Sequence, residues 1–67
     1  MNYQYLIKEL RNKMLLTQKE FADRLGVSFE TVNRWENGKN MPTMKIRRQL
    51  APLFKKYNIS EGGVGYE

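Results

Sequence analysis

Residues 17–37 read TQKEFADRLGVSFETVNRWEN and contain the clearest helix boundaries of the chain. Thr17 and Glu20 have the spacing of a capping box, in which each side chain accepts a hydrogen bond from the other residue's backbone amide at a helix N-terminus. Gly26 ends that helix, because glycine adopts the left-handed conformation without a side-chain clash. Ser28 is a second N-cap. The stretch therefore predicts two short helices joined at Gly26.

The second of these helices, residues 28–37, has two different faces. At about 100° per residue, Val32 and Trp35 lie on one side with Thr31 beside them. The apolar pair must face the protein, so the opposite arc faces solvent; it holds Phe29, Glu30, Asn33 and Arg34. In a small basic protein, two capped helices with such an outward face are typical of a device that places one helix in a DNA groove.

The outward side chains of this helix suit the edges of DNA bases. Arginine binds guanine through two hydrogen bonds, asparagine does the same for adenine, glutamate accepts from cytosine, and a phenyl ring packs on the thymine methyl. We therefore predict base contacts by Phe29, Glu30, Asn33 and Arg34. Two plainer interpretations stay open: Glu30 and Arg34 have the spacing of a surface ion pair, and Phe29 could be ordinary exposed apolar surface.

Apolar residues on both sides of this stretch predict further helices. Tyr3, Leu6, Ile7, Leu10 and Met14 recur at the spacing of an amphipathic helix. After a loop over residues 39–42, Thr43 caps a helix whose apolar positions continue to Phe54. Pro52 interrupts this pattern, so we expect a kink or a break near Ala51 and a separate short helix over residues 52–57.

Length and composition limit the chain to one small domain. It has 67 residues, which we divide into a domain over residues 1–57 and a flexible, glycine-rich tail over residues 58–67. It contains no cysteine and no histidine, so a disulfide is excluded and a zinc site is disfavoured. We expect no cofactor, no metal, no targeting segment, no membrane association and a cytoplasmic location.

Positive charge is concentrated in the second half of the chain. The net charge is +5, and residues 34–56 hold seven basic side chains against one acidic side chain, Glu36. Such asymmetry favours a polyanionic partner, although a merely solvated basic surface is the alternative. Helix N-termini and the residues after residue 36 are candidate phosphate contacts: Gln18, Ser28, Asn37, Lys39, Asn40 and Lys45. For Gln18, a simple exposed glutamine is the plainer interpretation.

The ordered set of motifs resembles the XRE family, the helix-turn-helix domains similar to phage repressors and Cro. The resemblance rests on residues 7–11, 16–22, 25–28 and 32–39 together with Pro42. It implies an all-α fold, a compact bundle of four or five helices of the lambda-repressor-like helix-turn-helix type. Phe29 departs from the family pattern, because that reading position often holds a polar residue.

The resemblance also carries expectations about the site. It implies that helix 28–37 enters the major groove, that Gln18 and the loop at residues 37–40 hold phosphates, and that Arg11 and Glu36 form a salt bridge. It implies a homodimer on a two-fold symmetric operator of double-stranded DNA, acting as a transcriptional regulator of bacterial or phage type.

Two functions of different class follow. The first is a sequence-specific double-stranded DNA-binding transcriptional regulator, specifically a repressor. The alternative is a protein-interaction module, such as the antitoxin of a toxin–antitoxin pair, whose contacts would be Phe29, Ile59, Val64 and Tyr66. An enzyme is disfavoured, because the chain shows no nucleophile paired with a base and no phosphate-binding glycine loop. Nothing in the sequence indicates a small-molecule ligand.

Overall fold

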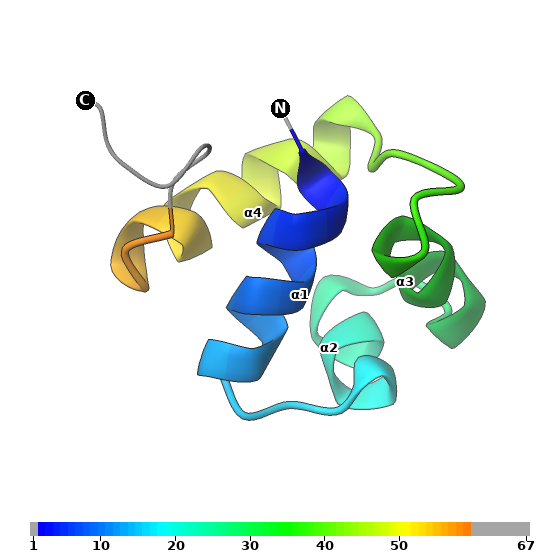
Figure 1. Cartoon of the computed structure of the whole chain (residues 1–67), viewed down its shortest axis with the longest axis horizontal. Coiled ribbons are helices and arrows are strands. Elements are labelled where there is room, and N and C mark those ends of the chain that lie inside the picture. The colour runs from blue at the N-terminus through cyan, green and yellow to red at the C-terminus, as the bar shows by residue number, and fades with distance from the viewer. Residues whose placement is uncertain (1, 60–67) are drawn as a thin grey trace.

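Four α-helices make up the part of the chain, residues 2–59, that the computed structural model describes. They are α1 (Tyr3–Lys13), α2 (Gln18–Leu25), α3 (Phe29–Glu36) and α4 (Met44–Lys56), with no strand in the described range (Figure 1). The predicted all-α class is therefore confirmed. Most of the predicted tail, residues 60–67, lies outside the described residues.

Each of these helices begins at a polar N-cap. The caps are Asn2, Thr17, Ser28 and Thr43, and the side chain of each accepts a hydrogen bond from the backbone amide three residues later. The predicted capping box is present in full, because Glu20 also accepts a hydrogen bond from the amide of Thr17 at 2.9 Å. Each cap satisfies one of the backbone amides that a helix start leaves without a partner.

The four helices also end in one kind of turn. The residue after each last turn lies in the left-handed region, namely Leu15, Gly26, Gly38 and Asn58. The amide of this residue donates to the carbonyl three residues before it, and the next amide donates to the carbonyl five residues before it. This is the Schellman motif, which satisfies carbonyls at the helix end. Helix length is thus set by local signals at both ends.

Leu15 is the unfavourable member of this set. At its φ of 59°, the Cβ atom lies too close to the backbone, which costs free energy. Leu15 is 88% exposed, so burial of its side chain offsets little of this cost. We expect Leu15→Gly to raise the free energy of unfolding by about 0.5–1 kcal/mol. Urea denaturation measures this, with Gly26→Ala as the matched opposite, since Gly26 has φ 76° and open space around its Cβ position. Equal stability of Leu15→Gly and the wild-type protein would contradict backbone strain at Leu15.

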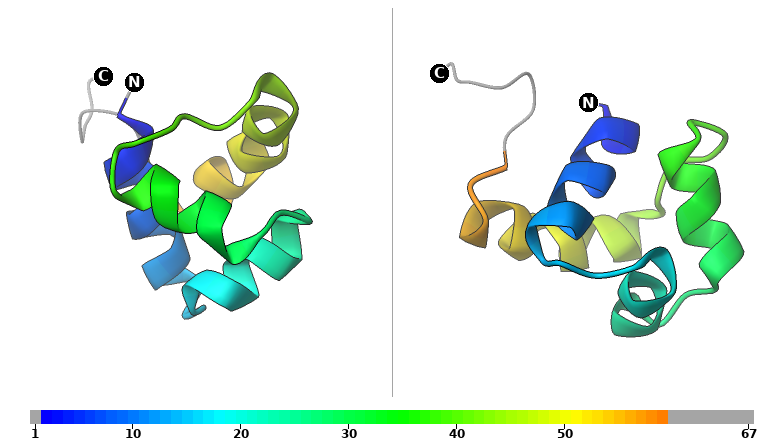
Figure 2. Two further views of the ribbon diagram at one scale, coloured as in Figure 1. Left: turned by 90° about the vertical axis from the view of Figure 1, so that its right-hand side faces the viewer. Right: turned by 60° about the horizontal axis from the view of Figure 1, so that its bottom comes forward.

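The hydrophobic core lies where α1, α2 and α3 meet and where α4 packs on α1. Its largest fully buried side chains include Phe21 from α2, Ile7 and Leu10 from α1, and Leu50 from α4. Helix α3 lies along one outer side of the molecule, with α1 behind it (Figure 2). One face of α3 is therefore packed on the core while the other remains available to a partner.

Pro52 does not divide the last helix, so the prediction of a separate helix over residues 52–57 was wrong. Helix α4 is one α-helix from Met44 to Lys56 with Pro52 inside it. Pro52 is exposed, and so is Arg48, whose carbonyl loses its usual amide donor and can be hydrated instead. Leu50 is fully buried on one side of the proline and Leu53 packs against the core on the other, which holds both halves in place.

The packed domain extends beyond the predicted boundary at residue 57. Asn58 adopts φ 58°, and the Ile59 amide donates to the Phe54 carbonyl at 2.8 Å. This turn brings Ile59 back to the core, where its side chain is only 9% exposed. Residues 58 and 59 therefore belong to the domain and not to a tail.

Candidate nucleic-acid interface

Helix α3 separates its apolar and polar side chains as predicted. Val32 is 0% and Trp35 is 3% exposed, so both pack into the core. On the other face, Glu30 and Arg34 are exposed, Phe29 is 46% exposed and Asn33 is half-buried. The four residues predicted to contact bases therefore lie at the surface or at its edge, on one side of one helix.

The surface ion pair considered for Glu30 and Arg34 does not form. Within residues 2–59, the side-chain ion pairs join Arg11 to Glu36 and Lys19 to Asp23. The Arg34 guanidinium is therefore not engaged by the carboxylate one turn before it. Among residues 2–59 no side chain accepts from its five N–H donors, which suit an acceptor such as guanine or a phosphate.

An ion pair between buried Glu36 and partly buried Arg11 anchors the end of α3. The Arg11 Nε donates to Glu36 Oε2 at 2.7 Å and its Nη2 donates to Oε1 at 3.0 Å, which makes the contact bidentate. The remaining Arg11 Nη1 donates to the Leu16 carbonyl at 3.0 Å. The pair that the family resemblance implies is thus present. It ties α3 to α1 and to the loop before α2, which fixes the angle at which α3 leaves the core.

Glu36 is held in its ionised form. Its burial raises the pKa, but hydrogen bonds from Arg11 and Gln18 and the positive charges of Arg11 and Lys8 together lower the pKa below its ordinary value. The same hydrogen bond with Glu36 raises the pKa of Arg11. The charge on the carboxylate is therefore part of the folded structure.

This lowered pKa predicts a sensitivity to acid. Because the pKa of Glu36 is lower in the folded than in the unfolded protein, its contribution to stability is complete above the unfolded pKa and is lost as the pH falls through the folded pKa. We expect the free energy of unfolding to decrease below about pH 4, and to decrease less over that range in Glu36→Gln. Urea denaturation of the wild-type protein and of Glu36→Gln at pH 7, 4 and 3 measures this difference. Matching pH profiles of the two proteins would refute the assignment of the acid sensitivity to Glu36.

Gln18 is placed differently from a simple phosphate contact. Its half-buried side chain donates from Nε2 to Glu36 Oε1 at 3.0 Å and accepts at Oε1 from Asn33 Nδ2 at 3.2 Å. Asn37 in turn donates from Nδ2 to Asn33 Oδ1 at 3.0 Å. Sequence reasoning missed this connection, because Gln18 and Asn33 lie 15 residues apart on different helices and no local spacing rule joins them.

The other predicted phosphate contacts surround the two ends of α3. Ser28 caps its N-terminus, accepting from the Thr31 amide at 3.2 Å. Lys39 and Asn40 are exposed in the loop that follows α3, and Lys45 is exposed in the first turn of α4. The predicted residues thus lie before α3, after α3 and at the start of α4.

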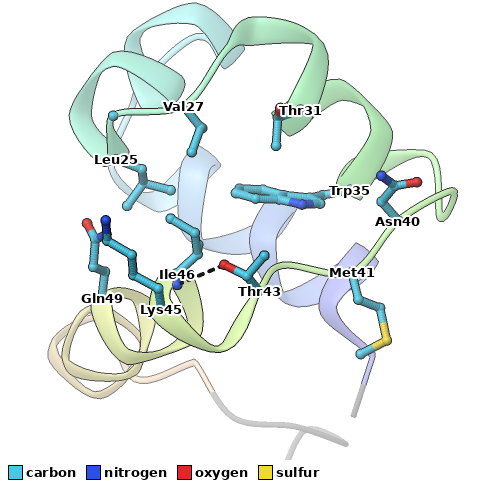
Figure 3. Close-up of a pocket in the computed structure, with 11 residues that line it drawn as sticks. Leu25, Val27, Thr31, Trp35, Asn40, Met41, Thr43, Lys45, Ile46 and Gln49 are labelled. Atoms are coloured by element: carbon cyan, nitrogen blue, oxygen red, sulfur yellow. Dashed lines mark hydrogen bonds between the residues drawn. The ribbon is translucent and has the colours of Figure 1, made fainter.

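A groove separates α3 from the start of α4. Its volume is about 510 Å³, and Figure 3 shows Trp35 among the side chains that line it, with Thr43 opposite. Asn40 and Lys45 also contribute to its lining. The groove therefore keeps the Lys45 side chain of α4 apart from α3.

The surface considered for a protein partner is smaller than expected. Ile59 is buried in the core and cannot serve as a contact residue, which corrects that part of the prediction. Val64 and Tyr66 lie outside the described residues. Of the predicted contacts within the described range, only Phe29 is exposed.

Two further observations concern the described part of the chain. No group of three or more histidine, cysteine, aspartate or glutamate side chains within residues 2–59 could hold a metal ion. In the same range, no helix is both long and apolar enough to cross a bilayer.

Comparison with known proteins identifies the family. A model of the helix-turn-helix family matches residues 7–61, which is most of the chain. The chain belongs to the XRE-type helix-turn-helix family. This helix-turn-helix protein is 44% identical over 48 residues to an uncharacterized HTH-type transcriptional regulator of Archaeoglobus fulgidus, covering 72% of the chain and 68% of the relative.

Other relatives of the helix-turn-helix protein are longer. A type II methyltransferase of Shigella sonnei is 52% identical over 40 residues, which cover 55% of the chain but only 11% of the methyltransferase. The HTH-type transcriptional activator BcrR of Enterococcus faecalis is 32% identical over 54 residues, or 81% of the chain and 26% of that protein. No solved structure matches the chain significantly.

Proposed function

We propose that the protein is a sequence-specific transcriptional regulator that inserts α3 into the major groove of double-stranded DNA. One observation carries the proposal: the outward face of α3 presents Phe29, Glu30 and Arg34, while a buried bidentate ion pair at Glu36 fixes the helix from behind. A groove-reading helix needs both features, because base contacts require polar groups held at a defined angle. Membership of the family supports DNA binding.

The roles that we propose for individual residues follow from their exposure and charge. Arg34 contacts a base, with Phe29, Glu30 and Asn33 around it. Lys39, Asn40 and Lys45 contact phosphates beside the groove, with Ser28 and Asn37 at the two ends of α3. The net charge of +5 attracts the polyanion and adds affinity that does not depend on sequence.

We further propose that the protein acts as a homodimeric repressor on a two-fold symmetric operator in the cytoplasm. Two copies of α3 would then lie about 34 Å apart, one turn of DNA. Since one relative is named as an activator, a promoter–reporter assay with and without the protein is the direct test of the regulatory sign. Lower reporter output supports repression, whereas higher output contradicts it.

The base contact of Arg34 is tested by alanine substitution. We first select bound duplexes from a random library, and then compare affinities for the selected duplex and for unrelated DNA. Arg34→Ala should weaken binding to the selected duplex by about 1–3 kcal/mol and relax the preference at one position.

Lys39→Ala is the matched control for this experiment. It should weaken binding to all sequences similarly and lower the slope of log affinity against log salt by about one. An Arg34→Ala protein that loses equal affinity for selected and unrelated DNA would rule out base reading by Arg34.

A further inference from the structure

A directional chain of hydrogen bonds connects the buried ion pair to the outward face of α3. Glu36 Oε1 accepts from Gln18 Nε2 at 3.0 Å, and Gln18 Oε1 accepts from Asn33 Nδ2 at 3.2 Å. Asn33 Oδ1 then accepts from Asn37 Nδ2 at 3.0 Å, while the same Asn37 nitrogen donates to the Asn33 backbone carbonyl at 2.9 Å. The chain thus runs from a buried carboxylate to a residue beside the predicted base contacts.

The carboxylate at one end fixes the orientation of each amide in this chain. An ionised carboxylate only accepts hydrogen bonds, so Gln18 must turn its NH₂ group toward Glu36. The Gln18 carbonyl oxygen therefore faces Asn33, which must answer with its own NH₂ group. Arg11 keeps Glu36 ionised through its two contacts. No member of the chain can flip its amide without placing two donors or two acceptors against each other.

This arrangement leaves a defined hydrogen-bonding capacity on Asn33. Its amide nitrogen keeps one N–H donor and its amide oxygen keeps one lone pair, since each atom has used one bond within the chain. One donor and one acceptor are what the major-groove edge of adenine requires, through its N7 acceptor and its N6 amino group. Because Asn33 is half-buried and held at both ends, it loses little side-chain freedom on binding.

We propose that Gln18 is a positioning residue, which orients Asn33 to read adenine in the major groove. This replaces its predicted role as a phosphate contact, and it rests on the proposed function. Glu36, which is only 4% exposed, thereby acts on base preference from the core. Gln18 itself contributes through Asn33 and not through a bond to the DNA backbone.

A pair of methionine substitutions tests this role. Gln18→Met keeps the length of the side chain and removes the amide, and Lys39→Met removes an exposed charge in the same way. Affinities are measured at several salt concentrations on the duplex selected by wild type, and on duplexes in which single adenines are replaced. For Gln18→Met we expect the preference for one adenine to fall by at least about fivefold, the lower limit for a good base contact, with the salt slope unchanged.

The control must behave in the opposite way. Lys39→Met should keep the adenine preference and lower the salt slope by about one. If Gln18→Met instead keeps the adenine preference and weakens binding to selected and unrelated DNA alike, Gln18 contacts a phosphate and the proposed positioning is wrong. Circular dichroism establishes that each variant is folded before binding is compared.

A second variant keeps the test decisive if Gln18→Met does not fold. Asn33→Ala, at a half-buried surface position, should abolish the preference for the same adenine; an unchanged preference overturns the proposal. Failure of the proposed function looks different, because a protein without sequence-specific binding enriches no motif from the random library. An enriched motif that contains no Asn33-dependent adenine refutes only the role of Gln18 and Asn33.

Discussion

Glu36→Ala is expected to destabilise the fold by about 3 kcal/mol, the lower end of the range for breaking a buried ion pair, because the Arg11 side chain is still 17% exposed. The substitution leaves the Arg11 guanidinium with only the Leu16 carbonyl as an acceptor, and it removes the acceptor of Gln18. A domain of this size is stable by roughly 3–10 kcal/mol. The variant should therefore lose a large part of its stability, which urea denaturation followed by circular dichroism measures.

A double variant separates the effect of losing the ion pair on stability from the effect of losing side-chain packing. Arg11→Met combined with Glu36→Leu replaces both charges with apolar side chains, so no unpaired charge remains in the interior. We expect it to be more stable than Glu36→Ala, giving a coupling energy of at least about 1 kcal/mol in a double-mutant cycle. Additive single effects would show that the two side chains do not act as a pair.

Trp35→Ala and Arg34→Ala should have opposite consequences although the residues are neighbours. Trp35 is 3% exposed, so its truncation leaves a large cavity and should cost about 3–5 kcal/mol of stability. Arg34 is exposed and outside the ion pairs of the described chain, so Arg34→Ala should change stability by less than about 0.5 kcal/mol.

The same two variants differ in binding. Arg34→Ala should fold normally and lose affinity for the selected duplex. Thermal unfolding and a binding titration, carried out on both variants, therefore separate the core face of α3 from its outer face. Large destabilisation by Arg34→Ala would place the guanidinium in the core and contradict the proposed interface.

Local rules predicted most of the fold, because short-range signals set both ends of the helices. Thr17, Ser28 and Thr43 are caps within three residues of their hydrogen-bond partners, and Gly26 supplies the left-handed turn. The spacing of Val32 and Trp35 likewise identified the buried face of α3. Each of these inferences needs only the chain within one or two turns.

The predictions that were wrong depended on longer-range packing. At Pro52, burial of Leu50 and packing of Leu53 outweigh the loss of one backbone hydrogen bond. At Ile59, a left-handed Asn58 returns the chain to the core, where the sequence pattern indicated only a glycine-rich tail.

The candidate site likewise combines features that follow from local spacing with contacts that depend on tertiary packing. Exposure of Arg34 and Phe29 follows from helical spacing alone. The link from Gln18 to Asn33 requires the angle between α2 and α3, which tertiary packing sets. The Arg11–Glu36 pair spans 25 residues, so no local spacing rule establishes the contact. Contacts between helices are therefore the part of the site that the sequence alone does not specify.

A titration of the ¹⁵N-labelled protein with the duplex selected from the random library, followed by NMR, tests whether α3 is the helix that reads DNA. We expect the largest changes at the backbone and side-chain signals of Phe29, Asn33 and Arg34, with smaller changes at Lys39 and Asn40. The Trp35 indole signal should stay close to its position in the free protein. Large changes confined to other helices, with α3 unaffected, would contradict the assignment of α3 as the DNA-reading helix.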